Sequence, residues 1–284
     1  MKARVAPVIE LLPYHARFRP VRRLGAGGFG VVELVEIRES KNPMLPAGQF
    51  FACKHLGKQW AKDPYALVRF EREIEQMRTM KHPRIVPLVG LSVPGDTRAY
   101  LMPAYARSLR AALRRKRKAQ PPAIVLAFVA DIADALHHAH TLGFIHRDIK
   151  PENILLNKAG HGHVADWGLG AFVHQHSRVL LNGVRKLGTS YYASAEQWTT
   201  GAGTAQSDIY SLGMVLAEML MARHVRMKIP GLGVQVRVLK SKKAPAQAVT
   251  DFVHQMTALV PSGRPQSMAI VRDRLRELAV MVKR

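Results

Sequence analysis

The eight residues from His146 to Asn153, which read HRDIKPEN, constrain this chain more than any other part of its sequence. They place the carboxylate of Asp148, the ammonium group of Lys150 and the amide of Asn153 within six residues. A proton acceptor, a cation and an oxygen that can bind Mg²⁺ are groups that phosphoryl transfer uses together. The simpler alternative is a polar turn between a helix and a strand that happens to contain these residues.

A glycine-rich pattern lies near the start of the chain. Residues 25–32 read GAGGFGVV, with Gly25, Gly27 and Gly30 in the spacing G-x-G-x-x-G. This spacing alone is a weak signal, because it also marks Rossmann folds, in which a helix follows. Here a β-type run from Val31 to Ile37 follows, and the strand-like segment Phe51–Lys54 comes next. The sequence therefore predicts a hairpin whose tip can approach phosphate groups closely, since a side chain there would hold the backbone away.

These motifs, in this order, resemble those of the eukaryotic-type (Hanks-type) serine/threonine protein kinase family. HRDIKPEN resembles its catalytic loop, residues 25–32 resemble its glycine-rich loop, and the segment that ends in Lys54 resembles its V-A-I-K strand. A match over eight residues argues strongly against a chance polar turn. Lys150, two residues after Asp148, is the form found in serine/threonine kinases. The resemblance covers roughly residues 18 to 278.

The resemblance implies a role for each matched polar residue. Asp148 would orient the substrate hydroxyl and accept its proton, and Lys150 would neutralise charge on the moving phosphoryl group. Asn153 and Asp166 would hold Mg²⁺, and Lys54 would contact the nucleotide phosphates. The residues expected around ATP are Gly25, Ala26, Gly27, Gly28, Phe29, Gly30, Val32, Ala52, Lys54, Met102 and Leu155, with Met102 or Pro103 at the back of the pocket.

An active kinase of this kind also needs a glutamate on a helix beside Lys54. The segment from Asp63 to Met80 predicts a helix that offers Glu71, Glu73 and Glu75. Glu73 lies at the edge of the apolar face and matches the glutamate of the family's R-E-I segment, so we expect it to pair with Lys54, with a surface charge as the alternative. The apolar face is defined by residues at helical spacing: Leu67, Phe70, Ile74 and Met77.

Two stretches depart from the family pattern. Trp167 stands where the family has Phe in D-F-G, and its larger ring is expected to fill the hydrophobic slot under the helix that bears Glu73. The balance between active and inactive packing is therefore open. Farther along, Ser194 and Ala195 replace the usual Ala and Pro, so the turn there is less restricted.

Further matches are expected to hold the site together. Thr189 would hydrogen-bond the catalytic aspartate and lysine, so it belongs with the catalytic residues. Glu196 matches a glutamate whose partner in the family is a distant arginine, here Arg264. Asp208 matches a buried aspartate that accepts hydrogen bonds from the backbone of the catalytic loop.

Arg147, directly before Asp148, marks the class of kinases that is often switched by phosphorylation of a loop. Ser177 is the only hydroxyl between Gly168 and Gly188. We favour a loop that is docked by Leu180, Leu181 and Val184 and an enzyme that is active as made. The alternative is a phosphorylated Ser177 that folds back to Arg147.

The chain is strongly basic, with a net charge of +23 from 43 Lys and Arg against 20 Asp and Glu. The simple interpretation is a solvated surface. The sharper one is attraction to acidic partners: acidic protein substrates, nucleic acid bound without sequence preference, or an anionic membrane surface. Aromatic residues do not interleave with the clusters, so base stacking is unsupported. The clusters contain Arg110, Arg114, Arg115, Lys116, Arg117 and Lys118, then Arg185, Lys186, Lys240, Lys242 and Lys243.

One cysteine, Cys53, excludes an internal disulfide and fits a reducing compartment. The sequence predicts no transmembrane segment, since no run approaches the roughly 18 apolar residues of a span. We expect an intracellular location, in the cytoplasm or nucleus, with a host cell of a virus or phage left open. The oligomeric state is also open.

The expected fold is α+β with two lobes. Residues 1–17 would form an N-terminal extension and residues 18–284 the kinase domain. A small antiparallel sheet with one helix would form the N-lobe, over about residues 18–103, and a mainly helical C-lobe would follow over about 106–284. We expect strands at Val21–Ala26, Gly28–Arg38, Gln49–His55, Ile85–Val93 and Thr97–Pro103, C-lobe helices at Ser108–Lys118, Pro122–Leu142, Asp208–Arg223, Pro245–Val260 and Pro265–Lys283, and a reduced subdomain at Gly231–Lys243.

The function implied by the resemblance is that of an ATP- and Mg²⁺-dependent protein kinase that phosphorylates protein Ser and Thr hydroxyls. A catalytically weak pseudokinase or scaffold is the first alternative, and it is disfavoured because Lys54, Asp148, Asn153 and Asp166 are all present. A basic, nucleic-acid-associated protein with a kinase fold is the second.

Overall fold

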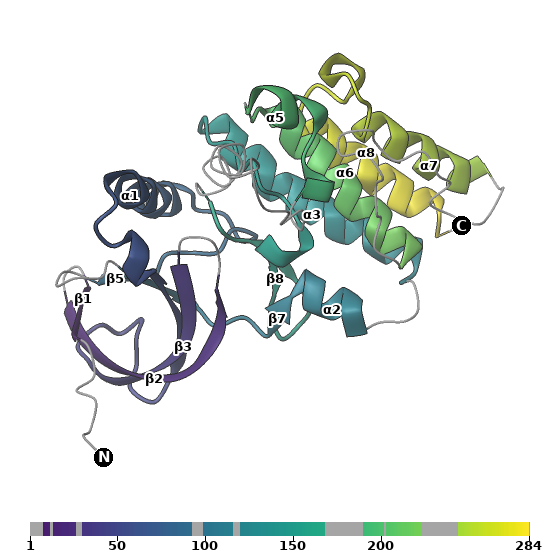
Figure 1. The fold of residues 1–284 in the computed structure, drawn as a ribbon. Coiled ribbons are helices and arrows are strands. Elements are labelled where there is room, and N and C mark those ends of the chain that lie inside the picture. Colours follow the sequence, from purple (N-terminus) through teal and green to yellow (C-terminus); the bar gives the residue numbers. More distant parts are fainter. Residues whose placement is uncertain are drawn as a thin grey trace. The chain divides into compact units, whose positions relative to one another are not determined.

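In the computed structural model the chain divides into two units (Figure 1). The N-terminal unit contains Met1–Lys81 and Val86–Tyr105, and the C-terminal unit contains His82–Ile85 and Ala106–Arg284. The structure describes residues 8–11, 14–26, 30–92, 99–115, 120–167, 190–201, 203–222 and 244–283.

The N-terminal unit is built on one six-stranded sheet in which every neighbouring pair is antiparallel. The order of its strands is β1-β2-β3-β4-β6-β5. The long strands β2 and β3 form the hairpin that the glycine pattern predicts. Their bounds are Val8–Leu11 (β1), Tyr14–Ala26 (β2), Gly30–Ser40 (β3), Phe50–Leu56 (β4), Gly90–Ser92 (β5) and Ala99–Pro103 (β6).

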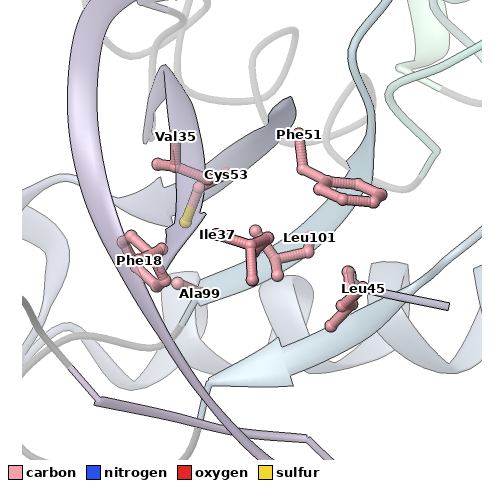
Figure 2. Packing of buried hydrophobic residues seen from close by; sticks show 8 residues of the cluster. All are labelled: Phe18, Val35, Ile37, Leu45, Phe51, Cys53, Ala99 and Leu101. Atoms are coloured by element: carbon pink, nitrogen blue, oxygen red, sulfur yellow. The ribbon is translucent and has the colours of Figure 1, made fainter. Parts of the chain in front are cut away.

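The core of the N-terminal unit lies against this sheet (Figure 2). Cys53 is part of it, and burial raises the pKa of its thiol to about 12, so the thiol packs as a small apolar group. Its immediate neighbours Ala52 and Lys54 are also buried. The core cluster contains Phe18, Val35, Ile37, Leu45, Phe51, Cys53, Ala99 and Leu101.

One α-helix, α1, runs from Pro64 to Thr79 in the N-terminal unit, after a 3-10 turn at Lys58–Trp60. Its first turn is stabilised by Asp63, whose side chain accepts a hydrogen bond of 3.0 Å from the backbone N–H of Ala66. Pro64 follows the cap, where its missing N–H costs nothing. The predicted helix and its capping residue are therefore confirmed.

The C-terminal unit is mainly helical, with a small sheet in the order β7-β8-β9. The contacts of α3 with α8 and α6, and of α6 with α7, make up its interior (Figure 1). The helices are Leu109–Arg115 (α2), Pro122–Thr141 (α3), Ala195–Thr200 (α5), Ala205–Met221 (α6), Ala244–Met256 (α7) and Met268–Met281 (α8), the strands are Arg107–Ser108 (β7), Ile154–Leu156 (β8) and Gly162–Val164 (β9), and 3-10 turns lie at Pro151–Asn153 (η2), Ser190–Tyr192 (η3) and Pro261–Gly263 (η4).

Over the residues that the structure describes, these elements confirm the predicted α+β architecture: an antiparallel sheet with one α-helix in the first unit, and mainly helices in the second. Among the described residues, α3 alone is long and apolar enough to cross a membrane by length and composition. More than half of its most apolar window is buried inside the unit, at 56%. Core helices of globular proteins pass the same test, so α3 gives no argument for a membrane span.

Several element boundaries differ from the prediction for local reasons. The strand predicted at Ile85–Val93 is reduced to Gly90–Ser92, and Ile85 instead forms a single parallel bridge with Val164. Strand pairing already begins at Val8, within the predicted extension of residues 1–17, because β1 pairs with β2. Helix α8 begins at Met268, because Ser267 caps it through a hydrogen bond to the N–H of Ile270. The predicted subdomain at Gly231–Lys243 lies outside the described residues.

Candidate active site

Lys54 and Glu73 form a buried ion pair in the N-terminal unit. The distance from Lys54 Nζ to Glu73 Oε1 is 2.8 Å, and the exposed fractions of the two residues are 5% and 0%. Tyr100 Oη donates a second hydrogen bond to the same oxygen, over 3.0 Å. Glu71 and Glu75 are exposed. The structure therefore brings together the lysine and the glutamate that the helix pattern singles out.

Strand register places Lys54 beside the expected nucleotide-binding residues. Gly25 pairs with Val32, Val32 with Lys54, and Lys54 with Tyr100. Residues directly opposite one another on antiparallel strands point to the same face of the sheet. Gly25, Val32 and Lys54 thus form one row across three strands.

Ala52 lies opposite Met102 in the neighbouring register position, so these two expected residues are also adjacent. Gly30 cannot carry a side chain, because a Cβ atom would lie 2.6 Å from the carbonyl oxygen of His55. Leu155 lies on β8, in the C-terminal unit. Four expected residues lie outside the described part of the chain: Gly27, Gly28, Phe29 and Thr189.

In the C-terminal unit, Asp148 contacts two other residues of the predicted catalytic loop. Lys150 Nζ lies 2.6 Å from Asp148 Oδ2, and Asn153 Nδ2 donates to the same oxygen over 3.0 Å. Asn153 Nδ2 also donates to the backbone carbonyl of Asp148 over 2.8 Å. The turn η2 brings Asn153 back to Asp148, so the carboxylate, the ammonium group and the amide converge.

The backbone of this loop is fixed by Asp208, which is fully buried at the first turn of α6. Its carboxylate accepts hydrogen bonds from the N–H groups of His146, at 2.9 Å, and Arg147, at 2.8 Å. The ring of His140 lies 2.8 Å from the same carboxylate. Arg147 has a φ of +67°, a left-handed conformation that a non-glycine residue adopts only where its surroundings enforce it. Asp208 supplies that constraint.

Asp166, the predicted second Mg²⁺ ligand, also has a left-handed backbone, with a φ of +65°. The preceding residue, Ala165, is tied to the catalytic loop, because its N–H donates to the carbonyl of Asn153 over 2.9 Å. Its own carbonyl lies 2.9 Å from Nε2 of His146. Two separate stretches of chain, each carrying a predicted metal ligand, are therefore held side by side.

Trp167 is fully buried and packs on His146, with ring centroids 4.6 Å apart. Its indole N–H has no hydrogen-bond partner among the residues that the structure describes. The contact that the structure gives for this ring lies within the C-terminal unit. The expected slot under the helix that bears Glu73 stays a prediction.

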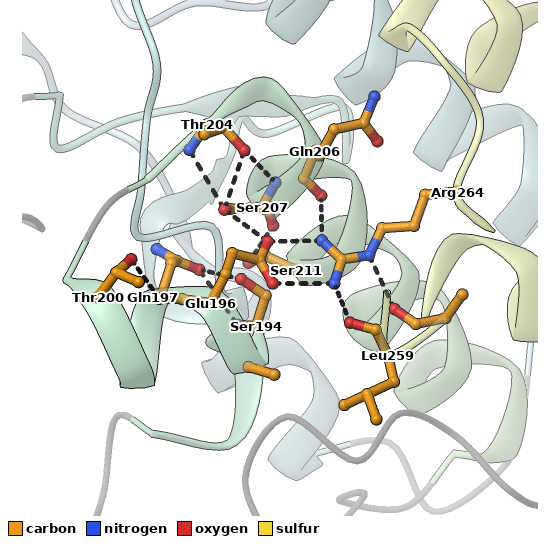
Figure 3. Close-up of polar contacts among 12 residues, drawn as sticks. Ser194, Glu196, Gln197, Thr200, Thr204, Gln206, Ser207, Ser211, Leu259 and Arg264 are labelled. Carbon is orange, nitrogen blue, oxygen red and sulfur yellow. Dashed lines mark hydrogen bonds and ion pairs between the residues drawn. The ribbon is translucent and has the colours of Figure 1, made fainter. Parts of the chain in front are cut away.

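Glu196 and Arg264 form the predicted ion pair, with oxygen-to-nitrogen distances of 2.7 and 3.0 Å (Figure 3). Arg264 uses all five of its N–H donors, because it also binds the carbonyl oxygens of Ala258, Gln206 and Leu259. Its side chain is fully buried. The pair thus ties α5 to the start of α6 and to the turn before α8.

The turn at Ser194 is held without the family's proline. Oε1 of Gln197 accepts hydrogen bonds from the backbone N–H and the hydroxyl group of Ser194, at 3.1 and 3.2 Å. Nε2 of Gln197 donates to the carbonyl of Arg147 over 2.9 Å. A side-chain amide therefore supplies the restriction that proline would give, and it links the turn to the catalytic loop.

A third buried ion pair was not predicted. Arg110, which the charge pattern predicted to lie in a basic surface cluster, is buried and contacts Glu152, Glu218 and Tyr192. The assignment to a surface cluster is therefore wrong for this residue. The signal that could have found the pair is Glu218, a carboxylate inside the apolar run of α6, since a buried carboxylate needs a partner.

The model of the protein kinase domain family matches residues 18–275 of the chain. The chain belongs to the protein kinase domain family. The motif order predicted this membership, and it is confirmed.

Curated relatives of this kinase domain include bacterial serine/threonine kinases. It is 30% identical over 286 residues to the probable serine/threonine-protein kinase pknA2 of Bifidobacterium longum, in a match that covers 93% of this chain and 35% of that protein. It is 32% identical over 210 residues to the serine/threonine-protein kinase PrkC of Bacillus subtilis, where the match covers 73% and 31%. The chain spans about a third of the length of these relatives.

Among solved structures, the kinase domain of Mycobacterium tuberculosis PknI matches with a TM-score of 0.67. The match covers 92% of this chain and 95% of that one, at 23% sequence identity. It shows that the two chains share a fold.

We expect replacement of Arg264 by Lys to lower the free energy of unfolding by about 3 kcal/mol. A lysine cannot reproduce five donors in a planar arrangement, so Glu196 and buried carbonyl oxygens would lose their partners. Denaturant unfolding measures the change. Arg274→Lys is the control, because its pair with Glu277 is exposed and should change stability by less than about 0.5 kcal/mol. Equal stability of Arg264→Lys and wild type would contradict the prediction.

Glu196 should also contribute a pH-dependent part of the stability. Burial raises the pKa of its carboxyl group, but hydrogen bonds, chiefly from Arg264, more than offset this and hold the pKa below the usual value of 4.5. The charged form therefore stabilises the fold above pH 4.5, and this contribution is lost as the pH falls through the lowered pKa. The difference in melting temperature between wild type and Glu196→Gln should accordingly be largest near neutral pH and shrink in acid. A difference in melting temperature that does not change with pH would contradict this role of the Glu196 charge.

Lys54→Met should reduce stability as well as activity, because it leaves the carboxylate of Glu73 buried without its cation. Breaking a buried pair in this way costs about 3–5 kcal/mol. The double variant Lys54→Met/Glu73→Gln should recover most of this stability, since a neutral amide replaces the buried charge, but it should not recover activity. Thermal unfolding and phosphate transfer, measured on the same samples, separate the two effects. Recovery of activity in the double variant would contradict a role of Lys54 in binding phosphate.

Proposed function

We propose that this kinase domain transfers the γ-phosphoryl group of ATP to Ser and Thr hydroxyls of proteins. The observation that carries the proposal is the convergence of Lys150 and Asn153 on one carboxylate oxygen of Asp148. Among the described residues, no hydrogen bond occupies the other oxygen, Oδ1. That oxygen is available to accept the proton of an acceptor hydroxyl.

The residues present fit Mg²⁺, which the protein kinase family generally uses together with ATP. Mg²⁺ prefers carboxylate and amide oxygens. The side-chain nitrogen of Asn153, Nδ2, donates its hydrogen bonds to Asp148. The side-chain oxygen, Oδ1, is therefore the atom that would bind Mg²⁺. Asp166 supplies the carboxylate, and the bonds of Ala165 hold it beside Asn153.

Each charged residue has a separate task in the proposed reaction. Bound MgATP supplies the phosphoryl group. Asp148 orients the acceptor hydroxyl and takes its proton, while Lys150 neutralises charge on the group in transfer. Lys54 binds the nucleotide phosphates, and Glu73 holds its ammonium group in place from α1.

The choice of Ser and Thr over Tyr rests on Lys150 and on the similarity to bacterial serine/threonine-protein kinases. A pseudokinase is disfavoured, because the four residues that phosphoryl transfer needs are present and two of them are joined by a hydrogen bond. No observation on the described residues favours nucleic-acid binding. Of the predicted basic clusters, Arg110 is buried, and Arg114 and Arg115 are exposed at the end of α2. The other members, Lys116, Arg117, Lys118 and all the lysines and arginines from 185 to 243, lie outside the described residues. The intracellular location stays a prediction.

Asp148→Asn should lower kcat for phosphorylation of a generic protein substrate by about 10²- to 10⁴-fold, because asparagine cannot accept the hydroxyl proton. Incorporation of labelled phosphate from ATP measures the rate, and phosphoamino-acid analysis should give phosphoserine and phosphothreonine. Asp251→Asn is the matched control, since Asp251 is exposed on α7. Wild-type kcat in Asp148→Asn, or phosphotyrosine as the only product, would overturn the proposed function.

A further inference from the structure

Arg110 connects three elements that lie far apart in the sequence. From α2, its Nε donates to Oε1 of Glu152 over 2.8 Å. Its two terminal nitrogens contact the carboxylate of Glu218 on α6 and the hydroxyl group of Tyr192 on η3. Tyr192 in turn donates to Glu218. One guanidinium group thus donates hydrogen bonds to two carboxylates and to a phenol hydroxyl group.

Of the four residues in this cluster (Arg110, Glu152, Tyr192 and Glu218), Glu152 lies in the catalytic loop. Glu152 lies in the turn η2, directly before Asn153, which is bonded to Asp148. Its side chain is 45% exposed, whereas that of Glu218 is 3% exposed. A substrate segment that brings its hydroxyl to Asp148 approaches the loop that also carries this partly solvent-facing carboxylate.

The charge balance of the cluster depends on Arg110. With it, two carboxylates and one guanidinium group leave a charge of about −1, and one oxygen of Glu152 and both oxygens of Glu218 have partners. Without it, the charge would be about −2, and a cationic substrate side chain would find two carboxylates without a counter-ion. Burial lowers the pKa of Arg110, but its bonds to Glu218 and Glu152 outweigh this and raise the pKa, so the guanidinium group stays charged.

We propose that Arg110 determines substrate specificity by filling, from within the chain, the place that a basic substrate residue would otherwise take. The chain then selects neutral or acidic segments around the acceptor Ser or Thr and gains nothing from arginine there. This inference rests on the proposed function. The net charge of the whole chain, +23, also disfavours basic substrate segments, because like charges repel.

A purely structural role for Arg110 is the competing explanation, because the same contacts also join α2 to α6. The two explanations predict different effects of removing Arg110. A structural clamp predicts lower stability with unchanged peptide preference. A specificity residue predicts a new preference for basic peptides, and this preference should require Glu152.

The test uses the full chain and a peptide set with one Ser acceptor, in which a single Arg, Glu or Ala occupies each position from three before to three after the Ser. In wild type, kcat/KM for Arg peptides should not exceed that for Ala peptides at any position. In Arg110→Met, the ratio of Arg to Ala should rise by roughly tenfold at one position or more. Adding Glu152→Gln should abolish the gain, and Arg110→Lys should keep the wild-type ratio.

Arg107→Met is the matched control, because Arg107 is exposed on β7, three residues before Arg110, and its loss changes the net charge equally. If Arg110→Met fails to fold, Arg110→Met/Glu218→Gln removes the unpaired buried charge and still leaves Glu152 without its cation. A tenfold preference of wild type for an Arg peptide, or an unchanged ratio in the folded Arg110 variants, would overturn the inference.

Peptide affinity, measured by fluorescence anisotropy, tests the specificity role of Arg110 separately from the proposed kinase activity, because the measurement needs no phosphate transfer. Absence of transfer to every peptide and protein would sink the proposed function, while a gain in affinity for Arg peptides in Arg110→Met would still support the specificity role. Transfer that occurs with the same preference in wild type and the Arg110→Met variant would refute the specificity role alone.

Discussion

The hydrogen bonds from the backbone of the catalytic loop to Asp208 set the geometry on which the proposed chemistry depends. Two N–H groups, of His146 and Arg147, donate to this one buried carboxylate. They hold Arg147 in a left-handed conformation that an unconstrained arginine would leave, and this conformation sets the chain direction at Asp148. Because Asp208 belongs to the first turn of α6, the apolar packing of that helix against α3 also positions the polar site.

Buried ion pairs in this protein join segments that apolar packing alone would leave free to shift. Lys54 and Glu73 connect β4 to α1, and Arg264 connects the turn before α8 to Glu196. The desolvation of two charges offsets much of their attraction, so such pairs add little stability compared with apolar residues of the same size. Breaking one is costly, however. The pairs therefore select one arrangement of the elements over its neighbours.

The sequence predicted the structure correctly where a motif or a helical spacing of apolar residues carries the information. Motif order predicted the fold, and helical spacing separated Glu73 from its two exposed neighbours. It failed for Arg110, because counting charges shows neither the burial of a charge nor its partner, here 108 residues away. It also missed the early end of α7 at Met256, where Thr257 bonds its side chain to the carbonyl of Val253. The first failure comes from a contact between residues far apart in the sequence. The second comes from a bond between a side chain and the backbone four residues earlier, which hydrophobic spacing does not show.

Net charge and local charge act at different ranges in a protein as basic as this one. The field of many exposed cations attracts acidic partners over roughly 8–10 Å at physiological salt and so changes mainly the rate of encounter. Selection of one residue beside the acceptor depends instead on whether a carboxylate near Asp148 still lacks a counter-ion. In wild type Arg110 supplies that counter-ion to Glu152 and Glu218. High salt should therefore weaken any general attraction to acidic partners, while the proposed indifference to a nearby arginine, which depends on the short contacts of Arg110, should persist.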